Sequence, residues 1–387
     1  MLHYKVVIAL VLFLFLTSET ALARRHHGRR FSGPTPTHPV VLWARTLTDS
    51  PDPEAKRVAA FKLSQYSQTI FQAEAVKAIT ACAKGYEFQL RVLCTKALGR
   101  AGNQSQNDFV RTTLFEVFDG EPKLKSTVVR ALTTRKDANP MVSDKLLAFV
   151  KETRDGDEQV TALAYFEMVG SASSKFISTM AEVFQKSEHS KVRRAVAKAL
   201  AEQGRGQDPV IELLAQCGGN KDDTPLILIC LGGLQLQGKT DARTWGTVEK
   251  ALESTDPDVQ LAVVDLIIAL PDAPNAKVAE RLLSLVDEVD DDDLQEKMVL
   301  SLGVVGDGSD KIVEALVRVL GNAEDSEGAR IAAALTIAKQ STNAEKSKEA
   351  LTRCVAEEKS DTLKSACQLA ATEISTKNRA VASPKKS

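Results

Sequence analysis

The sequence predicts an all-α protein, a right-handed α-solenoid of roughly ten stacked helical hairpins with a period of about 34 residues. The first observation is a residue, in most repeats small or aliphatic, that opens the second helix of each predicted hairpin. These anchor positions recur at nearly constant steps: Ala55, Leu90, Leu124, Val160, Val192, Leu226, Val259, Leu294, Ala329 and Leu363. A hairpin of this size cannot bury its apolar face alone, so the period indicates stacked neighbours.

The second observation is that the predicted second helices have matching start and stop signals. Three residues before the anchor an acid recurs, where it can meet the free N–H groups of a helix start: Asp52, Glu87, Glu121, Asp157, Asp223, Asp256 and Asp291. Pro53, Pro122 and Pro257 follow at the first helical position, which does not need an N–H group. Twelve residues after the anchor come Gly102, Gly204, Gly238 and Gly306, which suit a left-handed stop.

The third observation is helical periodicity. Apolar side chains follow the anchor at four, seven and eight residues, as in Val192, Val196, Ala199 and Leu200, which form one stripe of a helix. No stretch alternates with period two for long enough to suggest a sheet. In chain order, the first helices are predicted at 39–48, 70–83, 108–118, 142–152, 175–185, 209–217, 243–253, 277–286, 311–320 and 344–357.

The repeated pattern D-x-x-V-R-x-x-A-x-x-A-L-x-x-x-G resembles HEAT repeats over about residues 38–375. Val192-Arg193, Leu90-Arg91, Ala97-Leu98 and Ala199-Leu200 carry the resemblance best. Tetratricopeptide repeats share the period, but their Trp, Gly-Tyr and Pro markers do not recur here. The resemblance implies that the second helices line a concave wall, and that the first helices, with Trp43 and Trp245, line the convex one.

Basic residues often follow the anchor directly, at Lys56, Arg91, Lys125, Arg193, Arg330 and Lys364. An acid at minus three and a base at plus one are four residues apart on one helix, so we expect ion pairs within each repeat and a structural ladder between repeats. Partner binding is predicted for the second-helix residues Arg130, Arg194 and Lys198. Reversing these surface charges is expected to weaken partner capture and to change stability by no more than about 0.5 kcal/mol.

Residues 1–23 predict a signal peptide. Lys5 precedes an apolar run at 6–16, and Ala21-Leu22-Ala23 has the small-x-small pattern of a cleavage site. The run is shorter than the roughly 20 residues of a membrane span, so we expect cleavage after Ala23, export, and no stable span afterwards. Arginines directly after this site resist translocation and would suit a retained anchor, so this alternative stays open.

Two basic segments flank the predicted repeat array of residues 38–375. Residues 24–37 predict a basic flexible linker, because Gly33, Pro34 and Pro36 discourage a helix. Residues 376–387 predict a basic disordered tail. Charge within the array is close to balanced or slightly acidic, which gives no support for nucleic-acid binding.

The sequence offers little for catalysis. His189 is the only histidine well inside the array, and we expect it to cap a helix. There is no H-E-x-x-H, P-loop or G-x-S-x-G motif, and no His-Glu pair like that of the metal-binding HEAT hydroxylases. We therefore predict no enzyme and no cofactor. The acidic segment 287–293 favours a helix start over calcium binding, since the EF-hand pattern is absent.

The predicted function is an exported, non-enzymatic scaffold that binds a protein partner through its curved surface. One alternative is a HEAT-like bilin lyase that holds a tetrapyrrole, against which the scarcity of His and the 5% aromatic content weigh. Another is a structural component of the cell envelope. The apolar segment 225–238 is the best candidate for a hydrophobic contact on the concave wall, although burial explains it more simply.

The six cysteines occur in pairs separated by 12 or 13 residues. Cys94, Cys230 and Cys367 lie four residues after their anchors, and their mates Cys82, Cys217 and Cys354 lie eight or nine residues before them. This co-occurrence in repeats two, six and ten predicts three disulfides, each joining the two helices of one hairpin, although duplication of one repeat would imitate it. An exported protein meets an oxidising compartment where disulfides persist.

Alkylation of the unfolded, unreduced protein is therefore expected to label no cysteine. Mass spectrometry of its peptides should recover Cys82–Cys94, Cys217–Cys230 and Cys354–Cys367. The two α-carbons of each pair must approach within roughly 7 Å for this to hold. Six labelled thiols, or bridges between different repeats, would contradict the prediction.

Overall fold

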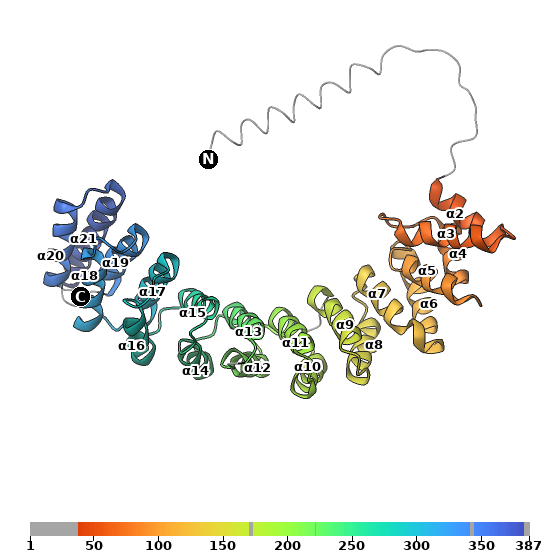
Figure 1. Ribbon diagram of the computed structural model, residues 1–387, viewed down its shortest axis with the longest axis horizontal. Coiled ribbons are helices and arrows are strands. Elements are labelled where there is room, and N and C mark those ends of the chain that lie inside the picture. The colour runs from red at the N-terminus through yellow and green to blue at the C-terminus, as the bar shows by residue number, and fades with distance from the viewer. Residues whose placement is uncertain (1–37, 170–172, 221, 341–343, 383–387) are drawn as a thin grey trace, which may run out of the picture.

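The structure is a computed structural model that describes residues 38–169, 173–220, 222–340 and 344–382. These residues form an arc of helical hairpins, which confirms the all-α solenoid (Figure 1). Within the described ranges, β-type pairing is limited to one isolated bridge between Ile70 and Ala101. Because Ile70 pairs there, the second first-layer helix begins at Ala73 rather than at residue 70.

The helices alternate between two layers. The first helices are α2 (Pro39–Asp49), α4 (Ala73–Ala83), α6 (Asn107–Gly120), α8 (Pro140–Glu152), α10 (Ser174–Lys186), α12 (Asp208–Gly218), α14 (Ala242–Ala251), α16 (Ala276–Leu285), α18 (Asp310–Gly321) and α20 (Ala344–Glu357). The second helices are α3 (Pro53–Gln65), α5 (Phe88–Leu98), α7 (Lys125–Arg135), α9 (Gly156–Val169), α11 (Ser190–Gln203), α13 (Thr224–Gln237), α15 (Pro257–Ala269), α17 (Asp292–Val305), α19 (Glu327–Gln340) and α21 (Asp361–Ala382). Two short 3₁₀ helices, η1 (Gln104–Gln106) and η2 (Pro122–Leu124), precede α6 and α7.

The second helices lie along the concave side of the arc and the first helices along the convex side (Figure 1). Each second helix packs on the second helices before and after it. In α11, the residues at the anchor and at plus four, five, seven and eight are Val192, Val196, Ala197, Ala199 and Leu200, and all are fully buried. This band is wider than one helix–helix contact requires, because it covers the partner helix and a neighbouring repeat.

The two ends of the array show which positions face which neighbour. In α21, which no further repeat follows in the described chain, the plus-five residue is the exposed Gln368. In α3, which no described repeat precedes, the plus-seven residue is the exposed Lys62. Plus five therefore faces the following repeat and plus seven the preceding one, and polar residues replace apolar ones where a neighbour is missing.

The fourth repeat corrects the predicted anchor. The carboxylate of Asp155 accepts hydrogen bonds from the N–H groups of Asp157 (2.8 Å) and Glu158 (3.1 Å), so it caps α9 in place of Asp157. Glu158, and not Val160, therefore occupies the anchor position. Its carboxylate accepts hydrogen bonds from the hydroxyls of Ser126 and Thr153, which allows a charged residue at a site that is apolar in most other repeats.

Only two of the four glycines predicted to end a helix in a left-handed conformation have a positive φ. Gly238 ends α13 with φ of 61°, and Gly102 has φ of 90°. Gly204 and Gly306 end their helices with negative φ, so the prediction is wrong for these two. At these two positions a larger residue would clash with its neighbours. A Cβ on Gly204 would lie 2.5 Å from Val210 Cγ2, and a Cβ on Gly306 would lie 2.5 Å from the Leu302 carbonyl oxygen.

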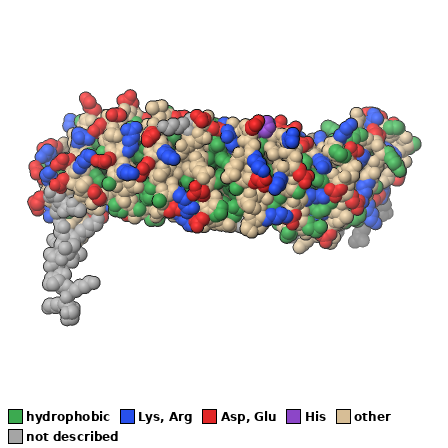
Figure 2. Space-filling view, turned by 90° about the horizontal axis from the view of Figure 1, so that it is seen from below, with side chains coloured by type: hydrophobic (Ala, Val, Ile, Leu, Met, Phe, Trp, Pro, Cys, Tyr) green, Lys and Arg blue, Asp and Glu red, His purple; other side chains and the backbone are tan. Residues whose placement is uncertain are grey.

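The convex face carries interspersed charges of both signs (Figure 2). Many of them form ion pairs between neighbouring first helices, at 2.5 to 3.8 Å: Arg45–Glu74, Lys145–Asp119, Lys175–Asp144, Arg243–Asp208, Lys277–Glu249, Lys311–Glu280 and Lys346–Glu314. Exposed pairs of this kind add little stability. Their main consequence is that the charges of the convex face largely neutralise one another.

Three disulfides join the same cysteines that the spacing predicts. Cys82 pairs with Cys94, Cys217 with Cys230, and Cys354 with Cys367, with Cα–Cα distances of 5.9, 6.0 and 6.3 Å. Each bridge lies inside one hairpin and connects the end of the first helix to the buried face of the second. The crosslinks thus fix helix pairs and leave the contacts between repeats uncrosslinked.

The terminal segments are only partly described. The signal peptide and linker predicted at 1–23 and 24–37 lie outside the described residues. The tail predicted to be disordered from residue 376 is helical as far as Ala382, where α21 ends. Helix-compatible residues continue to this point, and Pro384 disfavours a helical conformation in the residue before it. In the described part of the chain, none of the helices is long and apolar enough to cross a membrane.

Removing one whole period, from Glu158 through Lys191, is expected to leave a folded, shorter solenoid. The junction joins equivalent positions of two repeats, and contacts run only between neighbours. Circular dichroism per residue and cooperative thermal unfolding should persist. The control removes only positions 158–174, half a period, which leaves one helix without its hairpin partner, and it should lose the cooperative transition. Equal behaviour of the two deletions would contradict the stacked-hairpin fold.

Candidate protein-interaction surface

One residue of each second helix projects from the middle of the concave wall, six positions after the anchor. We call this set the central stripe: Phe61, Lys96, Arg130, Ala164, Lys198, Gly232, Asp265, Leu300, Leu335 and Leu369. None of these residues is buried. The plus-six position points away from the buried band of its helix, because about 3.6 residues make one turn. The stripe therefore runs along the whole concave face.

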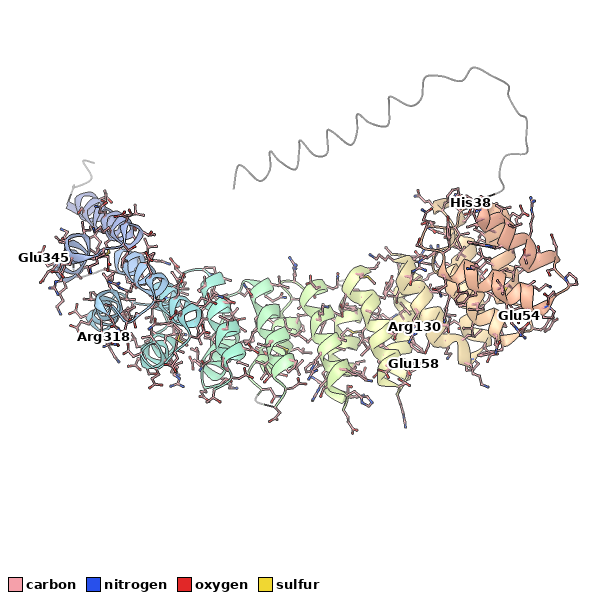
Figure 3. All side chains as sticks on the ribbon, turned by 45° about the horizontal axis from the view of Figure 1, so that its top comes forward. His38, Glu54, Arg130, Glu158, Arg318 and Glu345 are labelled. Carbon is pink, nitrogen blue, oxygen red and sulfur yellow. A yellow bond between two sulfur atoms is a disulfide. The ribbon has the colours of Figure 1, made fainter. Side chains whose placement is uncertain are left out.

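Two of the three predicted partner-binding residues belong to this stripe. Arg130 on α7 is exposed (labelled in Figure 3), and no ion pair involves it among the described residues. Lys198 on α11 lies 2.8 Å from the Glu167 carboxylate of the preceding repeat, and this hydrogen bond raises the Lys198 pKa. Lys198 is thus a neutralised member of the stripe, whereas Arg130 keeps its charge available.

Arg194, the third predicted partner-binding residue, forms an ion pair between repeats. Its Nε and Nη2 donate to Oδ1 of Asp223, at 3.0 and 2.7 Å, and Asp223 also accepts from the Leu226 N–H that begins α13. The Asp223 side chain is only 7% exposed. Burial alone would raise the pKa of Asp223, but the guanidinium and the Leu226 N–H outweigh it and lower this pKa. Reversing the charge of Arg194 would strand a buried carboxylate, so this change would destabilise the fold.

The same arrangement recurs between other repeats. A base near the start of one second helix binds an acid near the start of the next: Arg57–Glu87 at 2.8 Å, Arg91–Glu121 at 3.2 Å, Arg194–Asp223 at 2.7 Å, and Arg330–Glu358. The expected ladder between repeats is therefore present. Pairs within one repeat, from minus three to plus one, do not occur among the described residues, so that expectation is wrong. The minus-three acids either cap their own helix or meet a base from the preceding repeat.

A cleft of about 540 Å³ opens between α8 and α10, lined by Lys151, Glu182, Lys186 and His189 among others. Hydrogen bonds from Lys151 and Lys186 lower the pKa of Glu182 to about 2. His189 occupies the cap position of α11, but its side chain accepts no hydrogen bond from the helix, so capping by its imidazole is wrong. In the described ranges, no group of three or more His, Cys, Asp or Glu residues could hold a metal ion.

The acidic segment 287–293 is occupied by contacts within the protein. Asp287 pairs with Arg318, Asp291 accepts from the Leu294 N–H at 2.8 Å, and Asp293 lies 3.5 Å from Lys297. These contacts fit a helix start better than a ligand site.

Lys96 is the stripe residue that sequence reasoning missed. It is exposed on α5, and no ion pair involves it in the part of the chain described. The signal was present: Lys96 stands at the same plus-six position as Arg130 and Lys198.

No protein-family model and no curated protein matches the sequence. Solved α-solenoids resemble the structure. A crystal structure of importin beta has a TM-score of 0.53 at 14% identity, over 86% of this chain and 50% of that one. The structure of Kap95p with RanGDP has a TM-score of 0.50 at 10% sequence identity and covers 86% of this chain and 50% of that one. The structure of a Kap121p mutant has a TM-score of 0.50 at 12% sequence identity and covers 89% of this chain and 42% of that one. This chain thus spans half or less of these solenoids, and the likeness shows a HEAT-like α-solenoid fold.

Asp223→Asn is expected to lower the free energy of unfolding at neutral pH by about 1–3 kcal/mol, because Arg194 loses its charged acceptor. The folded-state pKa of Asp223 lies below the ordinary value near 3.9. Its stabilising contribution is therefore present above that value and lost as pH falls through the folded pKa. Thermal unfolding should show a gap between wild type and variant that closes below about pH 4.

The matched control is Asp222→Asn, at an exposed neighbouring position. This substitution should change the free energy of unfolding little at any pH. A gap for Asp223→Asn that is absent at neutral pH, or equal to that of the control, would contradict the structural role of the Arg194–Asp223 pair.

Proposed function

We propose that the protein is an exported, non-enzymatic scaffold that binds a protein partner along the concave face of its solenoid. The observation that carries this proposal is the central stripe, a row of unburied side chains that continues over all ten hairpins. A long curved surface lets many modest contacts add up to a stable complex.

Two features support export. Positions 1–23 have the composition of a cleaved signal peptide, followed by the proposed flexible linker at 24–37. The three disulfides fit an oxidising compartment, because the cytosol keeps thiols reduced. We therefore assign the protein to a secreted or periplasmic location.

The binding role is also supported by the kind of fold. Kap95p, a solenoid of similar shape, binds the protein RanGDP. The structure adds a distinction between the two faces of this protein: the convex charges are largely paired with one another, whereas Lys96 and Arg130 on the concave face are not. A partner with acidic groups would therefore meet unpaired basic side chains on the concave side.

Protein purified from the extracytoplasmic fraction is expected to begin at Arg24. Crosslinking in that fraction, followed by mass spectrometry, should recover a specific protein partner. Charge reversal at Lys96 and Arg130 should weaken its capture by about tenfold while the melting temperature stays within a few degrees, because both side chains are exposed and neither forms an ion pair in the described part of the chain.

The control is Lys77→Glu with Lys123→Glu, which changes the same net charge on exposed residues outside the central stripe. Capture that is equally weak in the control, or that no variant affects, would move the binding surface elsewhere. Absence of the protein from the extracytoplasmic fraction would refute export.

A further inference from the structure

We propose that the concave face of repeats two and three binds an acidic segment of an extended polypeptide, and that α13 binds apolar residues of the same polypeptide about eight positions away. This inference rests on the proposed scaffold function and names the chemistry of its partner. It follows from charge, apolar surface and spacing along one wall.

The first step is an uncompensated basic surface. Neither α5 nor α7 contains an Asp or Glu, whereas they contribute Lys96 and Arg130 to the central stripe. Both side chains are exposed, and neither forms an ion pair within the described residues. The Arg100 side chain, two residues after the end of α5, donates to the Tyr66 carbonyl oxygen at 3.4 Å, and no ion pair involves it among the described residues. Lys96 and Arg130 are thus two unpaired positive charges on the concave side of two adjacent repeats.

Several basic residues of the convex face lie beside carboxylates of the protein itself. Lys145, Lys175 and Lys311 on the convex face each lie within 3.2 Å of a carboxylate from the adjacent hairpin. Such charges are already neutralised, and a ligand would have to compete with the protein's own acids. At Lys96 and Arg130 an incoming carboxylate meets no competitor, so binding there gains attraction and loses no internal pair.

The third step is an apolar surface on the same wall. The helix α13, TPLILICLGGLQLQ, has no charged residue. Most of it is buried, but Leu236 is 43% exposed and Leu228 is only partly buried, with Gly232 between them in the central stripe. The small Gly232 leaves room between these two leucines for an apolar side chain of a partner. The stripe continues with Asp265, which pairs with Lys297, and then with leucine at 300, 335 and 369.

Spacing links the two surfaces. Three helix-to-helix steps separate α7 from α13, and packed helices lie about 9 Å apart, which gives about 27 Å. An extended polypeptide advances about 3.3 Å per residue, so about eight residues cover this distance. A partner with an acidic cluster and an apolar cluster at this separation would meet both surfaces at once.

The charge of the whole array favours a polypeptide over a nucleic acid. Residues 38–219 contain 25 Lys and Arg against 21 Asp and Glu, whereas residues 220–376 contain 16 against 29. A polyanion lying along the concave face would be attracted at one end and repelled over the other half. A chain that is acidic at one end and apolar further along avoids this repulsion.

The test is a selection of random 20-residue peptides displayed on phage against the full mature chain. Peptides enriched by wild type should carry Asp or Glu about eight positions from Leu, Ile or Phe. Their isolated affinity, measured by fluorescence anisotropy, should fall about tenfold in the Lys96→Glu, Arg130→Glu double variant and also at high salt. Lys77→Glu with Lys123→Glu is the matched control and should bind like wild type.

Selection against the double variant should enrich basic peptides instead, which a merely misfolded protein would not do. No enrichment by wild type, enrichment without acidic residues, or equal enrichment by the double variant would overturn the inference, as would tighter binding of single-stranded DNA than of the peptides. Capture of a cellular partner that ignores Lys96 and Arg130 would refute this chemistry while leaving the scaffold function standing. Failure to capture any partner would refute both.

Discussion

The structure depends on one constraint: a second helix buries its apolar band only when it has its own first helix and a neighbouring second helix on each side. In α11 the five band residues are fully buried, and this helix packs on α10 of its own hairpin and on α9 and α13 of the neighbouring repeats. The ends of the array confirm this requirement, because Lys62 and Gln368 replace apolar residues where a neighbour is missing. The arc, the continuous concave wall and the central stripe all follow from this repeated contact.

Electrostatic contacts differ between the faces of the solenoid. On the convex face and at the starts of the second helices, charges are paired across repeats, and Asp223 is the most buried acid among the pairs that link successive second helices. These pairs hold adjacent repeats in register, although exposed ones contribute little free energy. What remains unpaired on the concave wall is a small set of basic side chains in repeats two and three.

The disulfides stabilise single hairpins, whereas the stacking contacts join neighbouring hairpins. Each closes a loop of 12 or 13 residues within one hairpin, at repeats two, six and ten, and the chain-entropy estimate gives about 3 kcal/mol for a loop of this length. Because no bridge joins two repeats, the contacts between hairpins remain free to adjust. The solenoid thus consists of hairpins of which three are crosslinked internally, stacked through non-covalent contacts alone.

The sequence by itself determined the period, most of the first-helix ranges and the cysteine pairing, because all three are local: they depend on residues within one hairpin. Predictions from the sequence were wrong where the local residue pattern and the packing of the repeats disagree. Val160 looks like an anchor, but Asp155 starts α9 earlier and places Glu158 there. Only the tertiary structure decided which charged side chains form ion pairs, since the partners of Arg194 and Lys198 lie about 30 residues away in adjacent repeats. Whether a basic residue is paired or unpaired depends on which side chain the stacking brings next to it. The distance between these two side chains cannot be read from the sequence of either repeat.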